Sequence, residues 1–231
     1  MEPRVLRNIK ITVNEGEVLR YQGYRKQQPV SGAVRDVLNR EIKEGYQLIA
    51  PSAVYNQIDV SRIGNGMIEL VNGSILHLGA FVSDFKGAIS VSIAVCTIGP
   101  ALEERVAELF SQEEFAEALM LDSVGSVAAD AVADAVNYRI CQQARKLKMQ
   151  VGTRFSPGYG KWDVSEQKVL FQLCDASAIG VSLNEAYMMK PKKSVSFCVG
   201  IGQQSVGSHG VNRCRRCNME KCRYRNEEGN E

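Results

Sequence analysis

The longest helical pattern in the sequence, Glu113 to Leu147, constrains the fold more than any other feature. Its centre, residues 123–136, reads S-V-G-S-V-A-A-D-A-V-A-D-A-V and consists almost entirely of small residues plus two aspartates. Small side chains let another backbone or a ligand approach a helix closely. Asp130 and Asp134 are four residues apart and therefore share one face of the helix. Two interpretations are open: both carboxylates face water, or one of them binds a ligand.

Local patterns on both sides of this helix predict a mixture of helices and strands. Helices are expected at residues 15–24 and 31–46, with Ser31 as a candidate cap. Pro100 and the two glutamates after it open another helix, and residues 165–174 are also predicted to be helical. Asn72-Gly73 is a strong signal for a hairpin turn. The predicted strands and extended segments are residues 9–13, 51–63, 67–71, 74–78, 88–97, 180–189 and 194–201.

Composition and charge exclude several classes of function. The 231 residues are 45% hydrophobic and 23% charged, as in an ordinary globular protein. A net charge of +2 gives the body of the protein no attraction for a polyanion, so nucleic acid is an unlikely partner. The first ten residues contain no signal-peptide core, and the most apolar run, residues 88–102, is too short to span a bilayer. We therefore expect a cytoplasmic protein that does not contact membranes.

Residues 203–210 are rich in Gly, Ser and Gln, and this composition predicts a linker. The chain is accordingly divided into a body, residues 1–204, and a linker with a cysteine-rich basic tail, residues 205–231. In a reducing compartment the seven cysteines are free thiols. Four of them have apolar neighbours and are expected to be small core residues: Cys96, Cys141, Cys174 and Cys198. His77, in the predicted hairpin, is expected to be structural.

The tail carries Cys214, Cys217 and Cys222 within nine residues. This spacing predicts metal binding in a reducing compartment. An iron–sulfur cluster or a zinc ion needs a fourth ligand, which His209, Cys198 or a partner's thiol could supply. A cluster would carry electrons, whereas zinc would make the tail a docking knuckle. A disordered basic tail with incidental cysteines is the remaining alternative.

The segment Thr153 to Trp162, T-R-F-S-P-G-Y-G-K-W, contains too much Gly and Pro for a helix or a strand. Pro157 and Gly158 predict a tight type II turn, in which the glycine takes a positive φ. The segment also holds a lone arginine and the only tryptophan. A turn beside a fixed cation and an aromatic face suits a small, anionic, planar ligand. The alternative is a surface loop that its aromatic residues hold in place.

Four blocks of this half of the chain occur in an order and spacing that resemble the activation domain of cobalamin-dependent methionine synthase. They are R-F-S-P-G-Y at 154–159, I-G-V-S-L-N-E at 179–185, M-x-P at 189–191 and K-S-V-S at 193–196. The N-terminal E-V-L-R-Y at 17–21 resembles the small stand-alone versions of that domain more loosely. The resemblance implies an α+β fold in which a bent antiparallel sheet packs against helices. It also implies that S-adenosylmethionine lies along the Arg-x-x-x-Gly-Tyr loop.

Residue roles follow from the resemblance alone. Arg154 would pair with the ligand carboxylate, and Ser156 and Gly158 would offer backbone groups. Tyr159 would lie against the adenosyl part or the sulfonium. Asp130 would bind the α-amino group, with Asp134 as the alternative one helical turn away. Larger family members carry a Cys-Pro-acid-His run after the tyrosine, and this chain has G-K-W-D-V-S instead, so the histidine's role has no counterpart.

The implied function is that of an accessory subunit that supports reductive methylation of cobalamin. The cobalamin would be held by a partner methionine synthase or a related corrinoid protein, with flavodoxin or ferredoxin as the electron donor. Cobalt(I) is itself the nucleophile, so no catalytic residue is expected and the chain would act by positioning the methyl group. The alternative function is a metal-carrying redox or docking protein that delivers electrons to a corrinoid protein.

Overall fold

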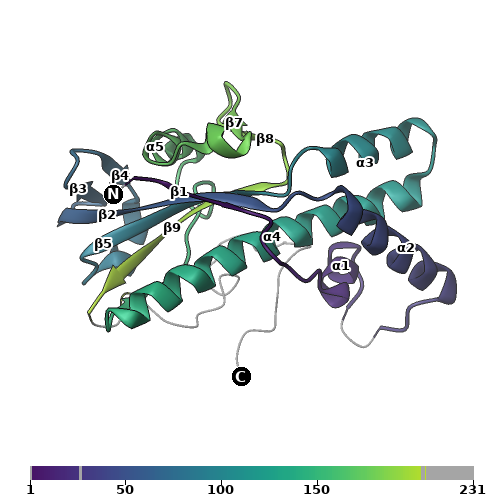
Figure 1. Ribbon diagram of the computed structural model, residues 1–231, viewed down its shortest axis with the longest axis horizontal. Coiled ribbons are helices and arrows are strands. Elements are labelled where there is room, and N and C mark those ends of the chain that lie inside the picture. Colours follow the sequence, from purple (N-terminus) through teal and green to yellow (C-terminus); the bar gives the residue numbers. More distant parts are fainter. Residues whose placement is uncertain (1, 26–27, 204–205, 207–231) are drawn as a thin grey trace.

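The computed structural model describes residues 2–25, 28–203 and 206, and an antiparallel sheet lies at its centre (Figure 1). In the described part the sheet has seven strands in the order β4-β3-β2-β5-β9-β6, and β1 pairs with β2 outside this path. The strands of the sheet are β1 (Arg4–Arg7), β2 (Ser52–Gly64), β3 (Met67–Leu70), β4 (Ile75–His77), β5 (Ser90–Thr97), β6 (Gln150–Val151) and β9 (Ser194–Gly202). A separate small hairpin consists of β7 (Ser182–Leu183) and β8 (Met189–Lys190).

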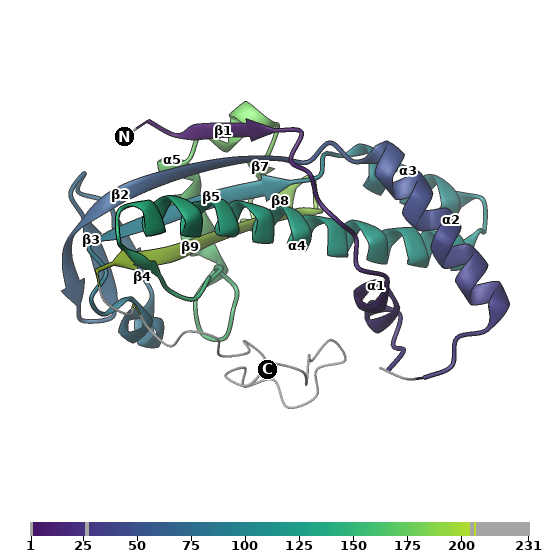
Figure 2. The ribbon, with the colours of Figure 1, turned by 60° about the horizontal axis from the view of Figure 1, so that its bottom comes forward.

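The sheet is bent along its longest strand, β2. The first half of β2 pairs with β1 and β5, and its second half pairs with β3 after a register shift between Val60 and Arg62. An irregularity of this kind increases the local bend and twist of a strand. Figure 2 shows β2 curving toward the end of the sheet that carries β3 and β4.

Helices cover both faces of the sheet (Figures 1 and 2). The long helix α4 runs along one face, with α1, α2 and α3 grouped at one end of it, and α5 lies on the opposite face. The α-helices are α1 (Glu15–Tyr21), α2 (Gly32–Leu48), α3 (Ala101–Ser111), α4 (Phe115–Lys146) and α5 (Gln167–Leu173). Short 3₁₀ helices are η1 (Gly79–Phe85), η2 (Val164–Glu166) and η3 (Ala176–Ile179). This arrangement confirms the predicted α+β fold with a bent antiparallel sheet packed against helices.

Small residues let α4 pack closely, as its sequence indicated. Ala128, Ala129 and Ala133 are buried in the core between α4 and the sheet. A Cβ atom added at Gly125 would lie 2.5 Å from Cδ2 of Leu102 on α3. The packing of α3 on α4 therefore leaves no room for even a methyl group at this position.

Most predicted elements are confirmed, including the hairpin at Asn72-Gly73. The cap of α2 is also confirmed, since Ser31 Oγ accepts a hydrogen bond from the Val34 N–H at 3.4 Å. The strand predicted at residues 9–13 is wrong: this segment leaves the sheet edge after β1 and leads to α1. Its alternation arises because Ile9 and Ile11 pack on the helical core.

The single extended segment predicted at residues 180–189 is also wrong, because it folds back as the β7–β8 hairpin. Asn184 makes the turn: its Oδ1 accepts hydrogen bonds from the N–H groups of Ala186 and Met188, at 3.0 and 2.9 Å. An asparagine that bonds to the backbone two residues later is a common turn former.

Val206, just past the predicted end of the body, is buried against β9. A Cβ atom at Gly200 would lie 2.8 Å from its Cγ1. Residues 207–231 lie outside the described part, so the division into body and tail stays a prediction. None of the helices in the described ranges is long and apolar enough to cross a membrane.

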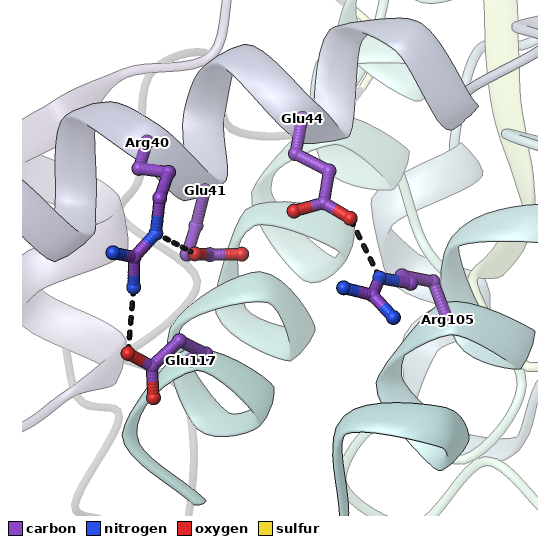
Figure 3. Close-up of polar contacts among 5 residues, drawn as sticks. All are labelled: Arg40, Glu41, Glu44, Arg105 and Glu117. Atoms are coloured by element: carbon purple, nitrogen blue, oxygen red, sulfur yellow. Dashed lines mark hydrogen bonds and ion pairs between the residues drawn. The ribbon is translucent and has the colours of Figure 1, made fainter. Parts of the chain in front are cut away.

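Ion pairs join α2 to α3 and α4 (Figure 3). Arg40 Nη2 lies 2.6 Å from Glu117 Oε1, and Arg105 Nε lies 2.7 Å from Glu44 Oε1. Glu41 is only 1% exposed, and its Oε1 accepts from Arg40 Nε at 3.0 Å. Its Oε2 has no hydrogen-bond partner among the described residues. Burial raises the pKa of Glu41 above its usual value, and the bond from Arg40 offsets this only in part.

Replacing Gly125 by Ala should destabilise the protein by about 1–3 kcal/mol, because the added methyl overpacks the contact with Leu102. Gly32→Ala is the matched control, since a Cβ atom at Gly32 meets nothing within 4 Å. Urea unfolding of both variants would check this. Equal stabilities for the two would contradict close packing of α3 on α4.

Replacing Glu41 by Gln should leave the protein at least as stable as the wild type at pH 7.5. The pKa of this carboxyl is higher in the folded protein than in the unfolded chain. Ionising Glu41 therefore destabilises the folded protein once the pH exceeds the pKa of the unfolded chain, and this destabilisation is absent near pH 4. The stability advantage of Glu41→Gln should therefore shrink as pH falls from 7.5 to 4. Urea unfolding across this range measures it, with Glu44→Gln at the half-exposed pair as the control. A loss of more than about 1 kcal/mol at pH 7.5 would show that Glu41 is instead a net stabilising ion.

Candidate functional site

The loop after β6 continues along the edge of the sheet next to β9. Phe155 and Cys198 exchange two backbone hydrogen bonds, with N···O distances of 3.0 and 2.8 Å. The predicted tight turn follows: the Tyr159 N–H donates to the Ser156 carbonyl at 3.1 Å, and Gly158 has a φ of +91°. A positive φ at this position is what a type II turn requires.

Aromatic side chains fix the loop from the far side of the sheet. Phe155 lies 5.3 Å from Phe81 and 5.8 Å from Phe85, measured between ring centroids. Trp162 is 2% exposed and packs in the same core. The loop is thus held in place by its aromatic residues, which was one of the two interpretations of the sequence. These residues also fix the position of Arg154, which is next to Phe155.

Arg154 points to the α4 side of the sheet and is 5% exposed. Its Cζ lies 5.2 Å from the ring centroid of Phe197 on β9, and its Nη1 lies 3.0 Å from Oδ1 of Asp134 on α4. The ion pair does not have hydrogen-bond geometry: among the described residues, Arg154 Nη1 and Ser156 Oγ are both buried without a hydrogen-bond partner. Buried polar atoms are almost always paired, so two unpaired ones only two residues apart make this loop a candidate binding site.

Asp130 lies one helical turn before Asp134 and is partly buried. Its Oδ2 accepts from the Tyr21 hydroxyl of α1, with an O···O distance of 3.4 Å. Burial raises the pKa of Tyr21 to about 12, and the charges of Asp130 and Tyr159 add to this shift. The structure thus brings Asp130 and Tyr159 together with Tyr21, which lies in the E-V-L-R-Y block but for which the sequence predicted no role.

The two aspartates therefore have different surroundings. Asp134 is 69% exposed and pairs with Arg154, whereas Asp130 is partly buried and contacts Tyr21. The interpretation that both carboxylates simply face water is therefore wrong for Asp130, while Asp134 faces water and also pairs with Arg154. Their roles toward a ligand stay a prediction.

Gly158 and Tyr159 are at the exposed end of the site. A Cβ atom at Gly158 would meet nothing within 4 Å, and Tyr159 is 44% exposed. The Gly158 N–H donates to the Trp162 carbonyl at 2.8 Å, so this N–H is used within the loop. The backbone group that Gly158 can offer a ligand is therefore its carbonyl.

The cysteines of the body behave as core residues. Cys96, Cys174 and Cys198 are buried and Cys141 is partly buried. Burial raises the pKa of the Cys174 thiol to about 12 and raises those of Cys96 and Cys198 further. Cys198, within β9, is therefore poorly suited to serve as a fourth metal ligand.

The metal site predicted in the tail cannot be described. Cys214, Cys217, Cys222 and His209 lie outside the described residues, so both this site and the alternative redox function stay predictions. The described part contains no group of three or more His, Cys, Asp or Glu side chains that could hold a metal ion. His77 Nδ1 lies 3.3 Å from Glu166 Oε1, a contact that joins β4 to η2 and suits the expected structural role.

Comparison with known proteins identifies the family and the fold of this chain. A family model described as the activation domain of vitamin B12-dependent methionine synthase matches residues 74–227. A crystal structure of the MetH reactivation domain bound to AdoHcy matches with a TM-score of 0.68 at 13% identity, covering 87% of this chain and 78% of that chain. No curated protein sequence matches. The family match spans well over half of the chain, and the chain therefore belongs to the family of vitamin B12-dependent methionine synthase activation domains.

Proposed function

We propose that the protein binds S-adenosylmethionine beside α4 and serves as a reactivation subunit for a cobalamin-dependent methionine synthase or a related corrinoid methyltransferase. Family membership supports this role. The MetH reactivation domain of the same fold was crystallised with AdoHcy, which is the same ligand without its methyl group. The partner enzyme would hold the cobalamin, and flavodoxin or ferredoxin would supply the electron.

The proposal depends on one observation: the Arg154 guanidinium is buried but incompletely hydrogen-bonded among the described residues. A buried cation is costly unless it is paired and hydrogen-bonded. Arg154 is 5% exposed, yet its Nη1 makes no hydrogen bond within the described part of the chain and its partner Asp134 is a surface residue. The carboxylate of an amino-acid ligand would complete this site, because a guanidinium can hold a carboxylate through two parallel hydrogen bonds.

Asp134 would act as a substitute for that carboxylate in the free protein. Its side chain is 69% exposed, so a ligand carboxylate can displace it into water at little cost. Asp130 would then bind the ligand's α-amino group, since it is partly buried and is held by Tyr21 rather than by Arg154. We therefore assign the contact with the ligand's amino group to Asp130 rather than to Asp134.

The rest of the ligand would extend along the loop. The face of Tyr159 can attract the sulfonium or stack on the adenosyl group. The Gly158 carbonyl and the backbone of Ser156 would accept or donate hydrogen bonds at the turn, where no side chain blocks approach. These residues are the ones that the resemblance implied, and their surroundings fit such a ligand.

The chemistry itself belongs to the two cofactors, because methyl transfer from a sulfonium to cobalt(I) requires no acid or base from the protein. The residues of this chain bind the amino-acid end of the ligand and fix the direction of the sulfonium. Holding reacting groups in the right geometry is a sufficient source of rate acceleration. The protein is thus proposed as an accessory subunit with no catalytic residue of its own.

Arg154→Ala should weaken S-adenosylmethionine binding by roughly 2–4 kcal/mol, as is typical when one partner of a buried charge pair is removed. Arg154→Lys keeps the charge but not the two parallel bonds, so it should also bind weakly. Isothermal titration measures both, and circular dichroism shows whether the variants fold. Wild-type affinity in a folded Arg154→Ala would remove the site assignment.

Asp130→Asn and Asp134→Asn form a matched pair on one helix. Asp130→Asn should weaken binding by about 1–2 kcal/mol, because it removes the charge that pairs with the α-amino group. Asp134→Asn should leave affinity unchanged or raise it slightly, since it removes a competitor for Arg154. The reverse order in the same titration would assign the amino group to Asp134.

A further inference from the structure

Helix α1 is fixed on α4 next to the site. Its N-cap Asn14 accepts from the Glu17 N–H at 3.1 Å, and Val18 is fully buried against the helical core. Gln22 Nε2 donates to the Leu119 carbonyl and to Ser123 Oγ on α4, both at 2.7 Å. These contacts fix the position of α1 along the axis of α4. Tyr21, the residue before Gln22, therefore reaches Asp130, which lies about two helical turns beyond Ser123.

The ring of Tyr21 is also held in one orientation. The guanidinium of Arg20 stands over it, with Cζ 4.9 Å from the ring centroid. Glu17 in turn holds Arg20 through Nη2 and Nε, at 2.8 and 3.0 Å from Oε2. The hydroxyl therefore has a fixed direction toward Asp130, although the O···O distance of 3.4 Å is long for this kind of bond. Bonds at binding sites often tighten only when the ligand is present.

We propose that Tyr21 is a positioning residue of the ligand site, whose hydroxyl donates to Asp130 and orients the carboxylate that binds the ligand's α-amino group. This inference rests on the proposed function. It gives α1 a role in binding although the family model matches only residues 74–227. Helix α1 is thus one wall of the site, with α4 and the Arg154 loop as the others.

The bond has a consequence for the charge on Asp130. The pKa of Tyr21 is raised to about 12, so its hydroxyl keeps its proton and donates throughout the neutral range. A donor to an ionised carboxylate favours the charged form and lowers its pKa. The other charged or titratable groups around this pair are Tyr159 and Arg20, which act on Tyr21, and Asp134 with Arg154, one turn along α4. Removing the hydroxyl should leave the Asp130 carboxylate without this donor, and its contact with the ligand's α-amino group should then weaken.

The test is Tyr21→Phe in the full chain, which keeps the ring and removes only the hydroxyl. Titration with S-adenosylmethionine at pH 7 should show about tenfold weaker binding. In an Asp130→Asn background, Tyr21→Phe should have no further effect, because the two residues act as one unit.

Tyr187→Phe, in the turn between β7 and β8 on the opposite face of the sheet, is the matched control and should bind as the wild type does (Figure 1). A thermal midpoint of Tyr21→Phe close to that of the wild type excludes a folding defect. If the wild type binds and Tyr21→Phe keeps the wild-type affinity, Tyr21 only packs, and the inference is overturned while the proposed function stands. If the wild type does not bind S-adenosylmethionine, the proposed function itself fails.

Discussion

The close packing of α4 against the sheet and its neighbouring helices is the constraint on which the rest of the structure depends. Gly125 admits Leu102 of α3 at a distance that no side chain would allow, and alanines fill the interface with the sheet. A helix with larger side chains would stand farther from both. Asp130 and Asp134 would then no longer reach Tyr21 and Arg154, so the small-residue surface of α4 sets the geometry of the charged groups at its margin.

The charge of Arg154 is balanced by Asp134, but the hydrogen bonds of its guanidinium are not complete within the described residues. Arg154 is removed from water by the loop and by Phe197, and a desolvated guanidinium requires an anion. Asp134, a surface residue, provides this anion without accepting a hydrogen bond from Arg154 Nη1. On the proposed function, a ligand carboxylate would accept that hydrogen bond. A fully satisfied ion pair would stabilise the free protein and compete with the ligand, so the imperfect pairing of Arg154 suits a binding site better than a structural ion pair.

Local signals in the sequence were sufficient for most of the fold. The Asn-Gly hairpin, the Ser31 cap and the Pro157-Gly158 turn each depend on residues that lie within a few positions of one another. Residues 9–13 show the alternation of a strand because half-buried coil beside helices alternates in the same way. The site could be predicted only in part. Tyr21 and Asp130 are 109 residues apart in sequence, so no local pattern predicts their contact. The loop was recognisable, whereas its pairing with Asp134 depends on how α4 is placed.

The site has one rigid side and one open side, and this asymmetry matters for an accessory subunit. Its less exposed side consists of the buried Arg154 and the partly buried Asp130 and Tyr21, which separate elements hold in place, whereas Gly158 and Tyr159 are exposed. On the proposed function, the amino-acid end of the ligand lies among these three residues and the sulfonium lies near Tyr159. The methyl group is then presented at the surface, where a cobalt ion carried by another protein can reach it. A fully enclosed pocket would bind the same ligand and prevent this transfer.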